Sequence, residues 1–157
     1  MPTTRLPFAN SKRSQVWSAA LAMIQASAPL KAGIARWIVP DGDVDAFAPI
    51  AETDLPCLSI TPRAGPAQWS SESQHRTDLY LDIELIVPGT LATDLMDAWT
   101  AIEGSIMPNS DLLNATRTLG VRNVALTSPG FTPRPWGKDL EALAATGTIT
   151  ITLYVDT

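Results

Sequence analysis

The clearest feature of the sequence is a strict alternation of apolar and polar residues over Thr77–Pro88, TDLYLDIELIVP. Successive side chains of a strand point to opposite faces, so this alternation separates two kinds of surface. The apolar face consists of Leu79, Leu81, Ile83, Leu85 and Val87. The polar face consists of Asp78, Tyr80, Asp82 and Glu84. This pattern is typical of a strand in an antiparallel sheet that has one covered and one uncovered face.

Two other segments show the spacing of an amphipathic helix. The first predicts a helix from Ser11 or Ser14 to Ser27, capped by one of these serines and stopped by Pro29. The second predicts a helix that is capped by Thr90 and ends before Pro108. Its apolar stripe consists of Leu91, Leu95, Trp99, Ile102 and Ile106. We expect Trp17 and Trp99, which lie on these stripes, to be core residues.

The remaining apolar runs predict further strands. They lie near Gly33–Val39, Pro56–Thr61, Leu119–Thr127 and Gly147–Asp156, and the alternating strand itself starts at His75 or Arg76. Loops are predicted at Arg63–Gln74 and Ser128–Gly137, and Asp139–Ala145 fits either a helical turn or a strand start. The order α-β-β-β-α-β-β predicts an α+β fold. We expect a mixed or mainly antiparallel sheet of about five strands with two helices on one face, in a single domain (14–157) after an N-terminal arm (1–13).

Composition supports a folded protein that covers part of its surface by association, since 45% of residues are hydrophobic and only 17% are charged. No apolar run approaches the roughly 18 residues of a membrane helix, and the first residues lack the apolar core of a signal peptide. We therefore expect a soluble protein that stays in the cytoplasm where it is made. The lone cysteine, Cys57, has no partner for an internal disulfide and is expected to be buried.

Charge is distributed unevenly along the chain. Residues 1–40 hold five basic residues and no acid, whereas residues 41–157 hold six basic residues and sixteen acids. The basic arm, with Arg5, Lys12 and Arg13, suits contact with nucleic acid or with an acidic neighbouring subunit.

One acidic loop resembles a calcium-binding template. Asp41, Asp43, Asp45 and Glu52 occupy positions 1, 3, 5 and 12 of that template. However, Ala46 replaces the glycine of position six, and the loop follows a predicted strand where the template has a helix. A solvated acidic loop is the better interpretation.

Signals for catalysis are weak. His75 is the only histidine, and it is not accompanied by a G-x-S-x-G elbow, a Walker loop or a G-x-G-x-x-G motif. The carboxylates Asp78, Asp82 and Glu84 suit general acid–base work, but they suit a wet surface, a channel wall or a subunit contact equally well. Trp69 and Trp136, both in predicted loops, either fold back on the domain or anchor an interface.

The order of these elements resembles a family of phage proteins. After the first helix come PCLSITP, a hairpin leading into HRTDLYLDIELIVPG, LMDAWTAIEGSI, GVRNVALTSPG and GTITITLYVD. The succession over residues 14–157 is similar to the tail terminator, or tail-completion, proteins of long-tailed bacteriophages. The related head-completion or neck connector proteins share much of this outline.

The resemblance implies a structural virion protein, without catalysis or cofactor, that forms a ring of six subunits. Such a ring caps the tail tube, ends its polymerisation and joins the tail to the head, so the implied partners are further copies of the chain, the tail tube protein and the neck connectors. DNA passes through the lumen without sequence-specific binding. We interpret Asp78, Asp82 and Glu84 as a lumen wall or subunit contact, and Arg5, Lys12, Arg13, Trp69 and Trp136 as further contact residues. The rival interpretations are a small enzyme or ligand-binding domain using His75, and a nucleic-acid-binding module.

Overall fold

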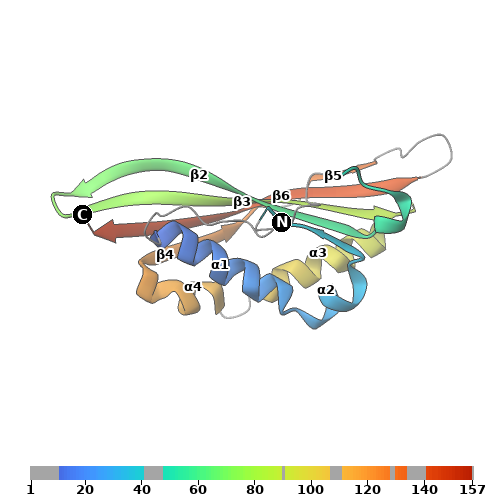
Figure 1. Ribbon diagram of the computed structural model, residues 1–157, viewed down its shortest axis with the longest axis horizontal. Coiled ribbons are helices and arrows are strands. Elements are labelled where there is room, and N and C mark those ends of the chain that lie inside the picture. The colour runs from blue at the N-terminus through green and yellow to red at the C-terminus, as the bar shows by residue number, and fades with distance from the viewer. Residues whose placement is uncertain are drawn as a thin grey trace.

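The computed structural model describes residues 11–40, 48–89, 91–106, 111–127, 130–133 and 141–156. These residues form an α+β fold in which a six-stranded sheet carries all the helices on one side (Figure 1). The strand order is β1-β2-β3-β6-β4, and β5 also pairs with β6. Every pairing is antiparallel except that of β1 with β2, so the predicted mixed sheet is confirmed, with six strands instead of five.

The strands differ greatly in length. The short ones are β1 (Arg36–Ile38), β4 (Val121–Leu126) and β5 (Gly130–Pro133). The long ones are β2 (Cys57–Ser71), β3 (Gln74–Pro88) and β6 (Ala142–Asp156). The predicted alternating strand is β3, and it lies at the centre of the sheet between β2 and β6.

The helical layer consists of α1 (Lys12–Gln25), α2 (Ala28–Gly33), α3 (Ala92–Ile106) and α4 (Asp111–Thr116). Two 3-10 turns, η1 (Glu52–Asp54) and η3 (Arg117–Leu119), complete the described elements. Ser11 caps α1 because its hydroxyl accepts a hydrogen bond from the Ser14 amide at 3.1 Å. Lys12 and Arg13, predicted to belong to the arm, therefore form the first turn of this helix.

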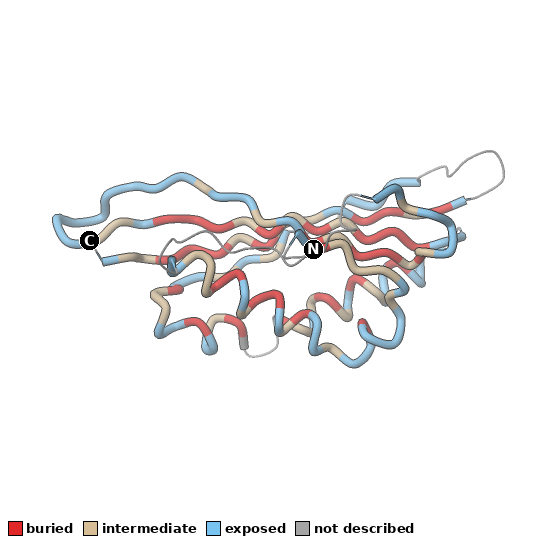
Figure 2. Tube along the Cα trace, viewed as in Figure 1, coloured by how far each residue is buried: buried red, intermediate tan, exposed pale blue. Residues whose placement is uncertain are grey.

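The core lies between this layer and one sheet face (Figure 2). The apolar face of β3 from Leu79 to Val87 is buried there, as predicted, against the stripes of α1 and α3. Trp17 and Trp99 are both core residues. The prediction that Leu91 belongs to the buried stripe of α3 is wrong, because this residue precedes the helix and remains 62% exposed. The predicted cap Thr90 lies outside the described residues.

A second, smaller apolar cluster lies on the opposite sheet face, at the end where β3 finishes. It consists of Leu55, Cys57, Ile86, Ala142 and Ala144. Cys57 is buried, as predicted. Arg36 holds the neighbouring loop, since its guanidinium donates to Asp54 Oδ2 and to the Pro49 carbonyl at 3.0 and 3.1 Å.

Several segments that were predicted to be irregular connections form helices or strands. Pro29 does not end the helical region but lies in the first turn of α2, where proline is tolerated. The predicted loop Arg63–Gln74 is wrong, because β2 continues to Ser71 and only Glu72 and Ser73 connect it to β3. The polar connection before β4 contains α4, and the proline-rich loop contains β5.

The outer part of β2 tolerates its prolines because of its position in the sheet. Pro62 and Pro66 lack an amide proton, and β1 pairs with β2 only as far as Ser59. Beyond Ser59 the outer edge of β2 therefore has no partner strand among the described residues, and proline is accepted on such an edge. The long ladder with β3 supplies the remaining hydrogen bonds.

Candidate assembly surfaces

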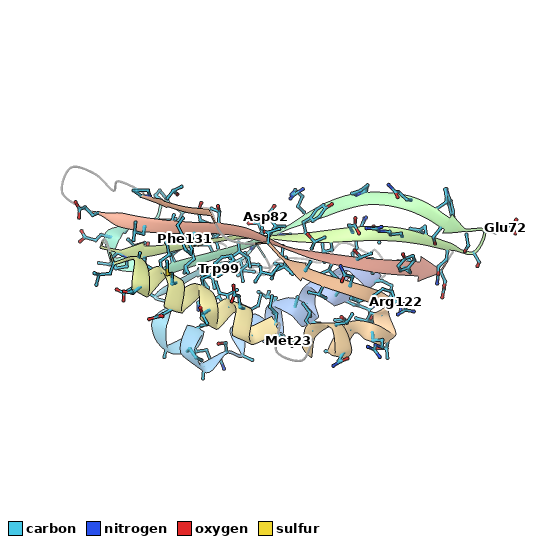
Figure 3. All side chains as sticks on the ribbon, turned by 180° about the vertical axis from the view of Figure 1, so that it is seen from behind. Met23, Glu72, Asp82, Trp99, Arg122 and Phe131 are labelled. Atoms are coloured by element: carbon cyan, nitrogen blue, oxygen red, sulfur yellow. The ribbon has the colours of Figure 1, made fainter. Side chains whose placement is uncertain are left out.

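Two surfaces of the described chain lie outside the core, and both contain residues predicted to be functional. The first, the open face, is the sheet surface opposite the helices. Its centre is Asp82, which lies on the far side of the sheet from the core residue Trp99 (Figure 3). The second, the hairpin end, comprises residues 66–76 of β2 and β3.

The register between β2, β3 and β6 brings polar residues of the three strands side by side on the open face. Asp82 on β3 is paired with Thr61 on β2 and Thr148 on β6, and Glu84 is paired with Ser59 and Thr146. Because directly paired residues share a face, these side chains form two polar rows across three strands. They line an open hollow of about 520 Å³, which Thr127 closes on one side.

Asp82 is the best organised group of this face. Arg63 donates to both of its oxygens, from Nε to Oδ2 at 2.9 Å and from Nη2 to Oδ1 at 3.2 Å. The Thr148 hydroxyl donates to Oδ1 at 3.0 Å. The Arg63 guanidinium also lies 4.4 Å from the centre of the Tyr80 ring, which fixes it further. These bonds, first that of Arg63 and then that of Thr148, hold the pKa of Asp82 below its ordinary value.

Asp78 departs from this arrangement. It is only 8% exposed, although it lies on the same face of β3. The chain bulges between Ala64 and Ala67, and a Cβ on Gly65 would come within 2.7 Å of the Asp78 Cβ, so the β2 backbone covers this residue. Its charge is met by Arg76, with Nε 3.5 Å from Oδ1. The surface carboxylates of the open face are therefore Asp82 and Glu84.

Apart from the first turn of α1 at its base, no described helix covers the hairpin end. Figures 1 and 2 show β2 and β3 continuing past the helical layer, with the last residues of β6 beside β3, and Figure 3 shows Glu72 at the tip. Trp69, predicted to lie in a loop, is on β2 and is 75% exposed. Its ring meets that of His75 edge to face, with centroids 6.0 Å apart. This end is thus a strand pair, flanked by the end of β6, that presents a tryptophan to solvent.

Arg13 lies at the base of the hairpin end and is not a free cation of the arm. Its Nη2 donates to the Gly65 carbonyl at 3.1 Å and to the Thr77 hydroxyl. These bonds tie the first turn of α1 to both strands of the hairpin. Lys12 beside it is exposed. Arg5 and Trp136 lie outside the described residues.

The candidate catalytic groups are not brought together. His75 and Asp82 are seven residues apart on one strand, which corresponds to roughly 24 Å. Cys57 is paired with Ile86, which lies eleven residues, or roughly 37 Å, from His75. With its pKa lowered, Asp82 stays ionised at neutral pH, a poor state for a general acid.

The metal-ligand pattern is only partly described. Asp41, Asp43 and Asp45 lie outside the described residues, and Glu52 is exposed in η1. Asp54 accepts hydrogen bonds from the Ala51 amide and from Arg36, which in this order lower its pKa. Within the described ranges, no three residues of His, Cys, Asp and Glu are grouped so as to hold a metal ion.

Sequence reasoning found Asp82, Glu84 and Trp69 but missed Arg63 and the threonines around Asp82. The alternation of threonines in β6 was evident from the sequence, but only the register between strands places Thr148 against Asp82.

No described helix is long and apolar enough to cross a membrane. No protein-family model and no curated protein sequence matches the chain.

Proposed function

We propose that this chain is a structural protein that assembles with copies of itself head to tail into a closed ring. The observation that supports this proposal most is the hairpin end, which extends beyond the helical layer and leaves Trp69 75% exposed. Tryptophan is among the residue types that contribute most at binding interfaces, so this exposed side chain is a candidate anchor for a contact between copies.

The shape of the hairpin end favours a head-to-tail contact. It projects from the rest of the domain, and we infer that it meets a different surface on the next copy. Such heterologous contacts close into rings when the rotation between copies permits and otherwise grow into filaments. The uneven charge of the chain, basic before residue 41 and acidic after it, fits the same arrangement.

Within this class we propose a tail terminator of a long-tailed bacteriophage. The resemblance in element order supports this choice, and so does the α+β fold with a long hairpin. In this role six copies cap the tail tube, stop its growth and join it to the connectors of the head, so the protein is located in the virion at the head-proximal end of the tail. This role is structural and involves no catalytic step or cofactor.

The open face suits a wall of the lumen or a contact between subunits. It presents Asp82 and Glu84 among hydroxyl groups, and Arg63 there is already bound to Asp82. A surface of this kind offers DNA phosphates few free cations, so DNA can slide past it without being held.

The direct test is the mass of the protein in solution together with negative-stain images. A ring of six subunits of 16.8 kDa has a mass of about 100 kDa and a central hole. The protein should also shorten the tubes formed by the tail tube protein of the same genome when the two are mixed during polymerisation. A protein that remains monomeric at high concentration and leaves tube length unchanged would refute the proposal.

A further inference from the structure

A groove separate from both assembly surfaces lies between α2, α3 and the end of β3. Its volume is about 360 Å³. It is lined by Pro29, Leu30, Gly33, Ile34, Pro56, Val87, Pro88, Asp94, Asp97, Ala98 and Ala101. Apart from two aspartates, all of these are apolar or small residues.

Small side chains create this groove. Ala98 and Ala101 lie three residues apart on α3, beside the stripe of buried residues, and are partly buried against the core. On the opposite wall, Gly33 has no atom within 4 Å of the position of an added Cβ. The groove is therefore open space that a side chain from elsewhere can fill.

Asp94 and Asp97 give the groove an acidic side. Both are exposed and lie in the first half of α3. No basic residue is among the described residues of the lining. Leu91, 62% exposed and one turn before Asp94, extends the apolar surface at the same end. A fitting ligand is thus a short apolar segment with an adjacent positive charge.

The chain itself contains such a segment. Residues 1–10, MPTTRLPFAN, place Arg5 directly before Leu6, Pro7 and Phe8 and contain no acid. A proline restricts the preceding residue to extended backbone angles, and in an extended chain Leu6 and Phe8 point to the same side. The segment therefore offers two large apolar side chains and one cation in the order that the groove requires.

The segment of the same molecule reaches towards the groove only along α1. From Arg13 to Gln25 this helix spans twelve residues, or roughly 18 Å, and Pro29, the lining residue that comes first in the chain, lies beyond that end. Phe8 and Leu6 precede Arg13 by five and seven residues, and a fully extended chain covers roughly 17 and 24 Å over those lengths. Phe8 of the same molecule therefore falls short of the groove, so we infer that the two side chains enter it together from another copy.

We propose that Leu6 and Phe8 of one copy occupy the groove of a neighbouring copy, with Arg5 beside Asp94 and Asp97. This inference rests on the self-association in the proposed function and adds a specific contact to it. The arm links adjacent subunits, and the groove is its receptor.

The first experiment measures binding of a fluorescent peptide of residues 1–10. The receptor is the full-length chain carrying Leu6→Ser and Phe8→Ser, so that its own arm does not compete. We expect saturable binding that weakens at least tenfold when Gly33→Leu is added to the receptor and when Leu6→Ser and Phe8→Ser are placed in the peptide. Asp94→Asn with Asp97→Asn should weaken binding about threefold to tenfold, and less at high salt.

Gly104→Leu is the matched control. Gly104 lies on α3 outside the groove and, like Gly33, has no atom within 4 Å of an added Cβ. This variant should bind the peptide as strongly as the parent receptor. No binding of the peptide, or equal binding by the Gly33→Leu and Gly104→Leu receptors, overturns the inference.

The second experiment identifies the copy that provides the arm. One batch carries Phe8→Cys, another carries Gly33→Cys, and both carry Cys57→Ala. Mixing and mild oxidation should yield a covalent pair containing one chain of each kind. An internal disulfide in a chain carrying both cysteines at high dilution, with no mixed pair, overturns the assignment to a neighbour.

The two proposals fail in different ways. Rings of the expected mass without a mixed disulfide or peptide binding refute only the role of the groove. A mixed disulfide in assemblies without a fixed size or central hole supports the groove and refutes the closed ring.

Discussion

The two faces of the central sheet are built from alternate residues of the same strands, yet they differ in what determines their structure. On the covered face Leu81 of β3 is paired with Ile149 of β6, and both are fully buried. On the open face the next residue, Asp82, is paired with Thr148 and is held by hydrogen bonds. Apolar burial fixes the first face, whereas directional polar bonds order the middle of the second, whose smaller apolar cluster lies at one end. The difference indicates that the main core stabilises one face and leaves the middle of the other free for contacts.

The largest effect should come from the covered face. Leu81→Ala removes a fully buried side chain and should lower the free energy of unfolding by about 2–5 kcal/mol. Thr61→Val keeps the shape of an exposed side chain of β2 and should alter the free energy of unfolding by less than about 0.5 kcal/mol. Urea denaturation of both variants measures the contrast. Equal losses would contradict the separation of the two faces.

The hairpin end should show the reverse behaviour. Trp69→Ala should leave the free energy of unfolding nearly unchanged because the side chain is 75% exposed. It should weaken ring assembly by about 30-fold, which corresponds to about 2 kcal/mol, if Trp69 anchors the contact between copies. Sedimentation over a concentration series measures this change.

Phe131→Ala is the control for that experiment, because Phe131 is an exposed aromatic residue of β5, far from the hairpin end in Figure 3. It should assemble like the parent protein. A Trp69→Ala variant that assembles normally would remove the hairpin end from the interface.

The smallest effect concerns the open face and depends on pH. The pKa of Asp82 is lowered in the folded protein, chiefly by Arg63, so its stabilisation is fully present above the unfolded pKa of about 3.9. It is lost as the pH falls through the lower folded pKa. Asp82→Asn should therefore cost less than about 1 kcal/mol at pH 7, since the ion pair is solvent-screened, and progressively less as the pH falls below about 3.9.

Thermal melts of the parent and Asp82→Asn proteins, from pH 7 down to values below about 3.9, test this sign. The comparison isolates Asp82, because the lowered pKa of Asp54 contributes acid sensitivity equally to both proteins. A difference in stability that grows as the pH falls would contradict the assignment.

Regular periodicity made much of the fold predictable. The alternation of β3 and the stripe of α3 each reflect one continuous face packed against one partner, so both were evident from the sequence. The outer part of β2 was not, because its glycine, prolines and serines favour loops and only the ladder with β3 holds them extended. The six-residue helix α4 lies in a segment too short for a periodic signal.

The candidate sites were predictable only in part. Residue type identified Asp82, Glu84 and Trp69 as unusual, but the burial of Asp78 depends on a bulge that brings Gly65 over it. The role of Arg13 depends on contacts 52 and 64 residues away in the chain. Such long-range contacts leave no local pattern in the sequence.

The two prolines on the free edge of β2 have a consequence for a protein that must self-associate. An uncovered strand edge is a template on which further strands can add without limit, and copies made at high concentration would be exposed to that hazard. Pro62 and Pro66 offer no amide proton to an incoming strand, and the bulge between Ala64 and Ala67 interrupts the edge again. Association through backbone pairing is thereby discouraged along this edge, so copies meet through side chains, whose geometry can limit the number of subunits.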